Sequence, residues 1–145
     1  MSSGYRYLED IALSDAAFEA WGESPEELFA AAADATVNVM VQDLGALARR
    51  ERREIRVRAD ELDLLLFELL QELIFYKDAE CLLLKVTQLK TDREADGWTL
   101  TAEAWGDRID PERHALLIDV KAVTLHRFRV WQTDEGWKAT VVLDT

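Results

Sequence analysis

The sequence predicts an α+β fold: a single domain over residues 1–145 with a mostly antiparallel sheet packed with two main helices. Three observations support this prediction. At 145 residues and 49% hydrophobic composition, the chain can bury one core. Two segments have helical patterns, and an alternating, strand-like segment separates them. The C-terminal half contains consecutive hairpin patterns, and strands that follow one another in this way form antiparallel sheets.

The N-terminal part of the chain is expected to contain a strand and then a helix. Residues 15–22 begin with an aspartate, continue with apolar residues and end in a glycine, which predicts a strand. Ser24 can cap a helix, the proline after it suits the first turn, and Glu27 completes a capping box. The alanine-rich run that follows predicts a helix to about Val41, because alanine has the highest helix propensity.

Residues 49–58 concentrate positive charge in a chain whose net charge is −12, since they contain six arginines and two glutamates. One interpretation is an edge that faces RNA or an acidic partner. The other is a charged edge strand at 53–59, with Ile55, Val57 and Ala59 pointing inward and the charges preventing edge-to-edge pairing. We favour the edge strand, because phosphate contacts usually come from a wider basic patch. We therefore expect no direct RNA binding.

A second helix is expected from about Asp60 to Lys77, with leucine, isoleucine and phenylalanine around most of its circumference. It is shorter than a membrane span and charged residues interrupt it, so we expect a buried core helix and no membrane insertion. Glu68 and Glu72 are four residues apart and share a face. They form either a shared acidic site or the solvated stripe of the helix, and we favour the stripe.

The C-terminal half is expected to form two hairpins. Strands over 82–91 and 98–105 flank an Asp-Gly step, which favours a tight turn. Strands over 127–133 and 137–144 flank a second turn that ends in Gly136.

Motifs of known catalytic sites are mostly missing: there is no glycine-rich phosphate loop, no pair of cysteines and no nucleophile elbow. The single cysteine, Cys81, lies in an apolar run and is predicted to be a buried hydrophobe. His114 lies in a polar connection and is predicted to be a surface loop histidine. His126 is expected in a strand, where it shares a face with Thr124 while Lys121 faces the other side.

The N-terminal residues lack the charged start and the apolar core of a secretory signal, and one cysteine excludes an internal disulfide. The cytoplasm is therefore the expected location.

A set of carboxylates at strand ends is the most promising candidate site. Asp15 begins one expected strand, whereas Asp144 and the α-carboxylate of Thr145 end another. If these two strands pair antiparallel, the three groups converge, and such close like charges repel one another without a cation between them. Ligands that are all oxygen favour Ca²⁺ or Mg²⁺ over Zn²⁺. Asp15, Asp144 and Thr145 are therefore a candidate metal site, and the alternative is that these isolated carboxylates belong to the solvated surface.

Several segments, taken together in their order and spacing, resemble the archease family over nearly the whole chain. They are 5–9 (YRYLE), 15–22 (DAAFEAWG), 24–29 (SPEELF), 38–41 (NVMV), 68–75 (ELLQELIF), 109–114 (IDPERH), 120–126 (VKAVTLH) and 136–145 (GWKATVVLDT). The C-terminal third carries the most specific of these motifs.

The resemblance implies an accessory protein rather than an enzyme in its own right. Archeases assist the RtcB-type ligase, which joins RNA ends in tRNA splicing and RNA repair. They promote formation of the ligase–guanylate intermediate and support multiple turnover. The family binds a divalent metal, described as calcium, through an acidic residue of the N-terminal motif and the C-terminal end. On this chain these positions are Asp15, Asp144 and Thr145, and we expect calcium there, with magnesium as the alternative.

The chain departs from the family pattern at two places. The family motif Leu-Glu-His-Thr-Ala-Asp corresponds to residues 8–15 (LEDIALSD), so the histidine is missing and two extra residues precede Asp15. Asp10 is therefore a second candidate for the metal-facing group. The tyrosine that often precedes the histidine of the family's later motif is replaced by Leu125.

Three hypotheses for function follow. The first is a metal-binding cofactor of an RtcB-type ligase. The second is a chaperone-like modulator of RNA-modifying enzymes without catalysis of its own, which makes apolar contacts through exposed aromatics such as Trp105 or Trp131. The third is RNA binding through residues 49–58. The sequence alone does not assign the identity of the client ligase, the oligomeric state, the physiological metal or the roles of Lys121, His126, Glu68 and Glu72.

Overall fold

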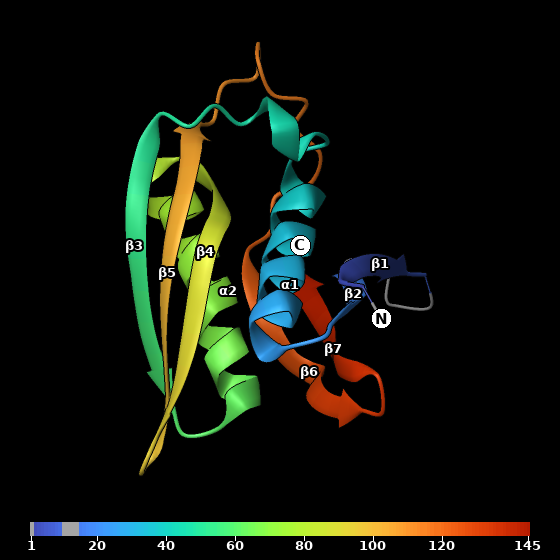
Figure 1. Ribbon diagram of the computed structural model, residues 1–145. Coiled ribbons are helices and arrows are strands. Elements are labelled where there is room, and N and C mark those ends of the chain that lie inside the picture. Colours follow the sequence, from blue (N-terminus) through green and yellow to red (C-terminus); the bar gives the residue numbers. More distant parts are fainter. Residues whose placement is uncertain (1, 10–14) are drawn as a thin grey trace.

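The computed structural model describes residues 2–9 and 15–145. It has an α+β architecture in which a pair of helices lies between two antiparallel sheets (Figure 1). In chain order the elements are β1 (Gly4–Leu8), β2 (Asp15–Gly22), α1 (Pro25–Met40), a short 3-10 helix (Leu44–Ala46), β3 (Glu51–Ala59), α2 (Leu62–Glu80), β4 (Leu82–Glu94), β5 (Gly97–Arg108), β6 (Ala122–Thr133) and β7 (Gly136–Asp144). The predicted fold class is therefore confirmed, although the strands divide into two sheets.

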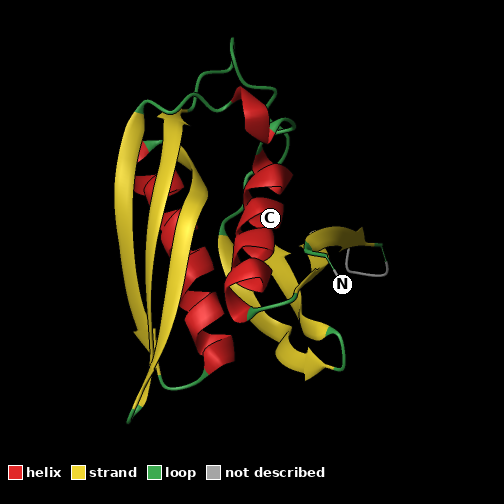
Figure 2. Ribbon diagram, viewed as in Figure 1, coloured by secondary structure: helices red, strands yellow, loops and turns green. Residues whose placement is uncertain are grey.

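The layers follow from the strand order and from the contacts of the helices. The four-stranded sheet has the order β1-β2-β7-β6, and the three-stranded sheet has the order β3-β5-β4. Helix α1 packs against β2 of the first sheet and β4 of the second, and α2 packs against β3, β4 and β6. The helices thus form a middle layer (Figure 2). Because α1 lies between the two sheets, it is buried on most of its sides, and several of its buried residues are alanines.

The signals at the start of α1 act as the sequence predicts. The Ser24 hydroxyl accepts a hydrogen bond from the Glu27 backbone N–H at 3.2 Å, and Pro25 occupies the first turn. Helix α2 ends three residues later than expected, at Glu80. No helix in the described part of the chain is long and apolar enough to cross a membrane.

The prediction that Cys81 is buried is wrong. Cys81 is exposed, and it caps the end of α2 in the left-handed conformation with φ 53°. The chain turns from α2 into β4 at this residue, so its side chain points to solvent at the helix end. Burial begins one residue later, at Leu82.

Strand β3 is an edge strand, as the sequence predicts for 53–59. Ile55 is buried, and Val57 and Ala59 pack against the core. Carboxylates of the same chain compensate several arginines here: Arg52 lies 3.2 Å from Glu103, Arg53 2.5 Å from Glu80, Arg56 2.6 Å from Glu54 and Arg58 2.7 Å from Asp96. Much of the positive charge of 49–58 is therefore neutralised locally, which favours the edge strand over an RNA-binding surface.

Candidate functional site

The predicted convergence of Asp15 and Asp144 is present in the four-stranded sheet. Strands β2 and β7 are antiparallel neighbours, and their register pairs Asp15 with Asp144. Side chains that are directly opposite in an antiparallel pair lie on the same face, with Cβ atoms about 5 Å apart. Thr145 follows directly, so the strand pairing brings the end of the chain to the start of β2. We call Asp15, Asp144 and Thr145 the carboxylate edge.

The two aspartates lie on the face of the sheet that points away from the helices. Phe18 of β2 and Val141 of β7 are buried in the core beneath α1 and α2. Side chains alternate between the two faces along a strand. Asp15 is three residues before Phe18, and Asp144 is three residues after Val141. Both aspartates therefore point to the face opposite these buried residues. Asp144 is exposed and Asp15 is half-buried. A cation can therefore reach them from solvent.

Neighbouring strands hold the main chain of Asp144 on both sides. Asp144 pairs with Asp15 of β2 and with Ala122 of β6. The Lys121 backbone N–H also donates a hydrogen bond to the Asp144 carbonyl oxygen at 2.8 Å. This end of the chain is consequently fixed in place, whereas most chain termini fray.

The carboxylate edge offers only oxygen ligands, which are the kind that a hard divalent cation prefers. Two carboxylates that face each other in a strand pair destabilise the sheet, and a cation that binds both removes this repulsion. Within residues 2–9 and 15–145, no three histidine, cysteine, aspartate or glutamate side chains gather as metal ligands. The α-carboxylate of Thr145 stays the predicted third ligand. Asp10, the second candidate from the N-terminal motif, lies outside the described residues.

Next to the carboxylate edge lies an exposed apolar surface that the sequence analysis did not find. Residues 115–121 form a connecting segment, which we call the strap, between β5 and β6. Leu117 is 55% exposed and Ile118 is 50% exposed. A groove of about 540 Å³ runs beside them, and Tyr7, Ala16 and Val39 also line it. Ala16 follows Asp15 in β2, and because side chains alternate along a strand, the groove lies on the helix side of the sheet and the two aspartates lie on the other side.

The strap is held firmly, although its apolar side chains are exposed. The Leu117 and Ile118 backbone N–H groups donate to the carbonyl oxygens of Met40 and Val39, at 2.9 and 3.2 Å. Leu116 also forms an isolated β-bridge with Val41. The end of α1 therefore anchors the strap along its length.

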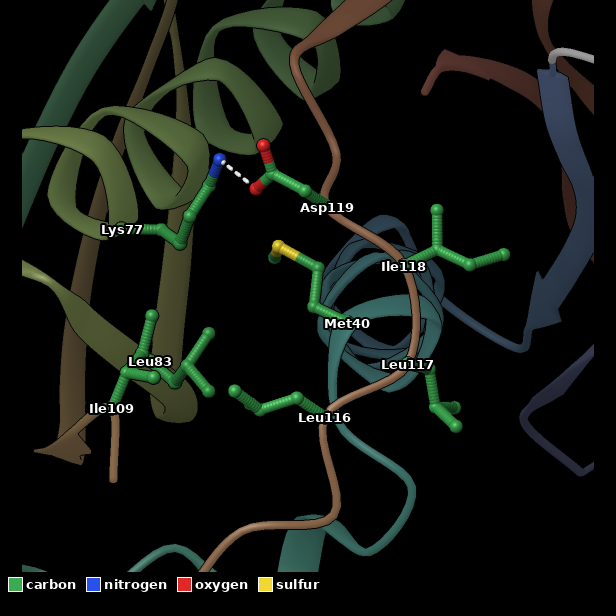
Figure 3. A pocket seen from close by; sticks show the side chains of 8 residues that line it. All are labelled: Met40, Lys77, Leu83, Ile109, Leu116, Leu117, Ile118 and Asp119. Carbon is green, nitrogen blue, oxygen red and sulfur yellow. Dashed lines mark hydrogen bonds and ion pairs between the residues drawn. The ribbon is translucent and has the colours of Figure 1, made fainter. Parts of the chain in front are cut away.

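Lys77 of α2 provides the second anchor of the strap (Figure 3). Its side chain is 7% exposed, and Nζ donates to Asp119 Oδ1 at 2.6 Å and to the Val120 carbonyl oxygen at 2.7 Å. Nζ also pairs with Asp78. Burial lowers the pKa of Lys77, but the hydrogen bonds to Asp119 and Asp78 outweigh burial and raise the pKa above its ordinary value. Lys77 therefore stays charged and ties the strap to α2.

The strap also lines a second, smaller pocket. Leu116 points toward Leu83 and Ile109, into a pocket of about 210 Å³ on the α2 side. Leu117 and Ile118 point away from these residues.

The prediction that His114 is a surface loop residue is wrong, because His114 is only 2% exposed. Nδ1 accepts a hydrogen bond from the Asp110 backbone N–H at 3.0 Å, which assigns the ring proton to Nε2. Nε2 lies 3.4 Å from Oδ2 of the buried Asp107. The turn at 110–113 folds back on the end of β5 and places the imidazole beneath it. Asp110 and Arg113 have opposite charges and are three residues apart in the sequence, and this spacing was a signal of the compact turn. In the structure the two side chains lie 2.9 Å apart.

The other singled-out residues do not join the carboxylate edge. Trp105 and Trp131 are half-buried, and the guanidinium carbons of Arg49 and Arg129 lie over their rings at 5.0 and 4.4 Å, so they are not the exposed aromatics expected for a chaperone-like surface. His126 is exposed on an irregular stretch of β6, where the register to β7 shifts.

The glutamates of α2 behave as the favoured interpretation predicts. Glu68 is exposed and Glu72 is half-buried, so they form part of the solvated stripe of the helix. Gln71 beside them accepts a hydrogen bond from the Val123 backbone N–H of β6 at 3.0 Å.

Known proteins resemble this chain in both sequence and fold. The model of the Archease protein family (MTH1598/TM1083) matches residues 5–145. The archease of Pyrococcus abyssi is 33% identical over 141 residues, which cover 97% of this chain and 95% of that protein. The archease of Methanothermobacter thermautotrophicus is 36% identical over 141 residues, with coverage of 97% and 98%.

Two solved structures share the fold. The solution structure of protein 1598 from Methanobacterium thermoautotrophicum is 34% identical, with a TM-score of 0.84 and coverage of 98% of this chain and 99% of that one. The crystal structure of an archease and possible chaperone from Thermotoga maritima is 21% identical, with a TM-score of 0.62 and coverage of 97% and 98%, and its likeness concerns the fold alone. By the family match and these relatives, the chain belongs to the archease family.

Proposed function

We propose that this protein activates an RtcB-type RNA ligase in tRNA splicing and RNA repair, and that it does so in the cytoplasm. It promotes guanylylation of the ligase and multiple turnover, and it does not catalyse a reaction itself. Membership of the archease family supports the proposal. The observation that carries the mechanism is the β2–β7 register, which places Asp15 opposite Asp144 at the end of the chain.

In this proposal Asp15, Asp144 and the α-carboxylate of Thr145 hold a divalent cation, calcium with magnesium as the alternative. The bound cation would neutralise the facing carboxylates and offer positive charge to oxygen ligands of the ligase. The protein's own contribution is to present a rigid edge, since β2, β6 and the Lys121 N–H fix the main chain of Asp144. This edge docks near the nucleotide or metal site of the ligase and favours its active conformation.

The test is the single-turnover guanylylation rate of the RtcB-type ligase from the same organism, with and without this protein. Asp144→Ala should abolish the acceleration and leave the fold intact, because Asp144 is exposed and supports no core contact. Deletion of Asp144 and Thr145 should likewise abolish the acceleration. Asp134→Ala is the matched control, since it removes an exposed aspartate from the turn between β6 and β7. Normal acceleration by Asp144→Ala would show that the carboxylate edge is not the activating group.

A second candidate function is a chaperone-like modulator of RNA-modifying enzymes. The exposed strap favours it, because contiguous apolar surface commonly marks sites of protein contact. Light scattering of the ligase at elevated temperature in excess EDTA separates the two functions. Protection from aggregation without metal would support the chaperone-like role, and its absence would leave the metal-dependent role alone.

A further inference from the structure

We propose that Lys77 of α2 is a positioning residue for the cation site at the carboxylate edge. Its ammonium holds the peptide unit between Val120 and Lys121, and this peptide unit holds the carbonyl oxygen of Asp144. This inference rests on the proposed function, because it concerns the cation site on which that function depends. An ammonium has no acceptor and cannot be a metal ligand, so Lys77 acts only through the groups that it holds.

The first contact is a buried ammonium that uses all its donors. Lys77 Nζ donates to Asp119 Oδ1 at 2.6 Å and to the Val120 carbonyl oxygen at 2.7 Å, and it pairs with Asp78. An ammonium has three donors, so these partners satisfy it completely. Val120 is fully buried, and a hydrogen bond from a charged donor is short and strong. The Val120 carbonyl is therefore fixed relative to α2.

The second contact is made by the same peptide unit. The Val120 carbonyl and the Lys121 N–H belong to one planar group, so a bond that fixes the carbonyl also fixes the direction of the N–H. This N–H donates to the Asp144 carbonyl oxygen at 2.8 Å. A peptide that accepts a hydrogen bond at its oxygen is polarised and becomes a better donor at its nitrogen. Lys77 thus both orients and strengthens the bond that holds Asp144.

The third group in the series is the last peptide unit of the chain. The Asp144 carbonyl lies in the planar unit that joins Asp144 to Thr145, so holding this oxygen leaves only the dihedral angles of Thr145 to place the α-carboxylate. Strand pairing with Asp15 and Ala122 fixes Asp144 up to this point, and the Lys121 N–H extends the hold to the final unit. Ligands that are ordered before the cation arrives bind it at a lower entropic cost.

Helix α2 supports the same stretch of β6 at a second point. Gln71 Oε1 accepts a hydrogen bond from the Val123 backbone N–H at 3.0 Å. Ala122, which pairs with Asp144, lies between the peptide unit that Lys77 holds and Val123. The start of β6 is therefore fixed to the helix layer on both sides of the residue that faces Asp144.

The charge of Lys77 has the opposite effect on a cation, which separates positioning from electrostatics. A positive charge near a cation site weakens binding by Coulomb repulsion. If Lys77 acted through its charge alone, a neutral side chain at this position would tighten calcium binding. If Lys77 only stabilised the fold, a folded variant would bind calcium as the wild type does. Weaker binding by a folded variant is expected only if Lys77 positions the ligands.

The experiment measures the Kd of calcium by isothermal titration calorimetry, with the full chain and without ligase. Lys77→Met should raise Kd roughly tenfold, because losing a group that orients metal ligands commonly costs ten- to a hundredfold in affinity. Lys85→Met is the matched control, since it removes the same charge from an exposed lysine that pairs with Asp34 at 2.9 Å. Its Kd should stay within about twofold of the wild type, because exposed charges are screened. Circular dichroism shows whether each variant is folded at the temperature of the titration.

NMR of the wild type provides the test if Lys77→Met does not fold. Coupling between two sites acts in both directions, so calcium should slow hydrogen exchange of the Lys121 amide and shift the resonances of this amide and of the Lys77 ammonium. The Arg50 amide, which donates to the Gly106 carbonyl oxygen in the other sheet, is the control and should not change.

The contrary outcomes are separable. An unchanged or lower Kd in folded Lys77→Met would overturn the positioning role and leave the proposed function standing. So would an equal rise in Kd for Lys85→Met, or Lys121 and Lys77 signals that do not respond to calcium. A wild type that binds neither calcium nor magnesium would overturn the cation mechanism and this inference together. If Lys77→Met weakened calcium binding but the wild type did not accelerate the ligase, the positioning role would be upheld and the proposed function alone would be wrong.

Discussion

Asp107 and His114 show how much one buried contact depends on charge compensation. The Asp107 carboxylate is almost fully buried at the end of β5, where it lies 2.9 Å from Arg113 and 3.9 Å from Arg50. Burial raises the pKa of Asp107, but the two arginines outweigh burial and hold the pKa below its ordinary value. The ionised carboxylate therefore stabilises the fold, and the buried His114 packs against it.

We predict that Asp107→Asn lowers the free energy of unfolding by about 2 kcal/mol near pH 7, because it removes a charged hydrogen-bond acceptor from a buried site. The folded-state pKa of Asp107 is depressed, so its stabilisation is present above about pH 4 and is lost as pH falls through the folded-state pKa. Urea unfolding at several pH values measures this. The difference between wild type and variant should shrink below about pH 4, and a difference that persists there would contradict the electrostatic explanation.

At the scale of elements, the predictable parts of the fold are those with local signals. Ser24 and Pro25 mark the start of α1, and the Asp-Gly step before Trp98 marks a hairpin, so both were found. The β2–β7 pairing was the condition on which the candidate metal site depended, and the structure has it: β2 begins with Asp15, β7 ends with Asp144, and the register pairs the two. Strand β1 was missed: it is short, and its identity depends on pairing with β2, which lies beyond the N-terminal motif.

Burial of single residues was harder to predict than the elements themselves. Cys81 sits beside an apolar run, yet a helix end turns its side chain outward. His114 sits in a polar run, yet a turn folds it under β5. The strap was missed for the same reason, since nothing in its sequence shows that Leu117 and Ile118 stay uncovered. In each case, packing from distant segments decided the outcome.

The strap should loosen when its anchor on α2 is removed. Lys77→Met keeps the apolar stem but leaves the Val120 carbonyl oxygen without its donor, so we expect a loss of about 2 kcal/mol in stability. The amides of Leu117 and Ile118 should exchange hydrogen faster in native-state exchange followed by NMR. Lys85→Met is the control: Lys85 pairs with Asp34 of α1 at 2.9 Å, but it is exposed, and such surface pairs contribute little. Equal exchange in both variants would show that α1 alone holds the strap.

At the scale of the whole molecule, the middle layer of helices separates two sheets with different surfaces. The three-stranded sheet carries the arginines of β3, largely paired, on its edge. The four-stranded sheet carries the carboxylate edge, and the strap joins the two sheets across the end of α1. The exposed side chains of Leu117 and Ile118 therefore lie where the chain passes from one sheet to the other.

The carboxylate edge predicts opposite effects of one substitution on the metal-free and the metal-bound protein. In EDTA, Asp144→Asn should be more stable than the wild type by up to about 1 kcal/mol, because it removes the repulsion between Asp144 and Asp15. With calcium at about 100 times its Kd, the wild type should gain about 2.7 kcal/mol. For a chain of this size that corresponds to about 2 to 4 °C in Tm for each kcal/mol. Asp144→Asn should lose most of this gain, so the order of stability reverses when calcium is added.

Thermal unfolding by circular dichroism, with calcium and with magnesium in separate titrations, measures this reversal without any ligase. Asp134→Asn serves as the control, because Asp134 is exposed in a turn away from the paired aspartates, and it should follow the wild type in every buffer. If calcium raised the Tm of Asp144→Asn as much as that of the wild type, the cation would bind elsewhere. If Asp144→Asn were less stable than the wild type in EDTA as well, Asp144 would support the sheet itself. Only a reversed order of stability on adding calcium agrees with two carboxylates that repel each other across the β2–β7 pair and that bind a cation together.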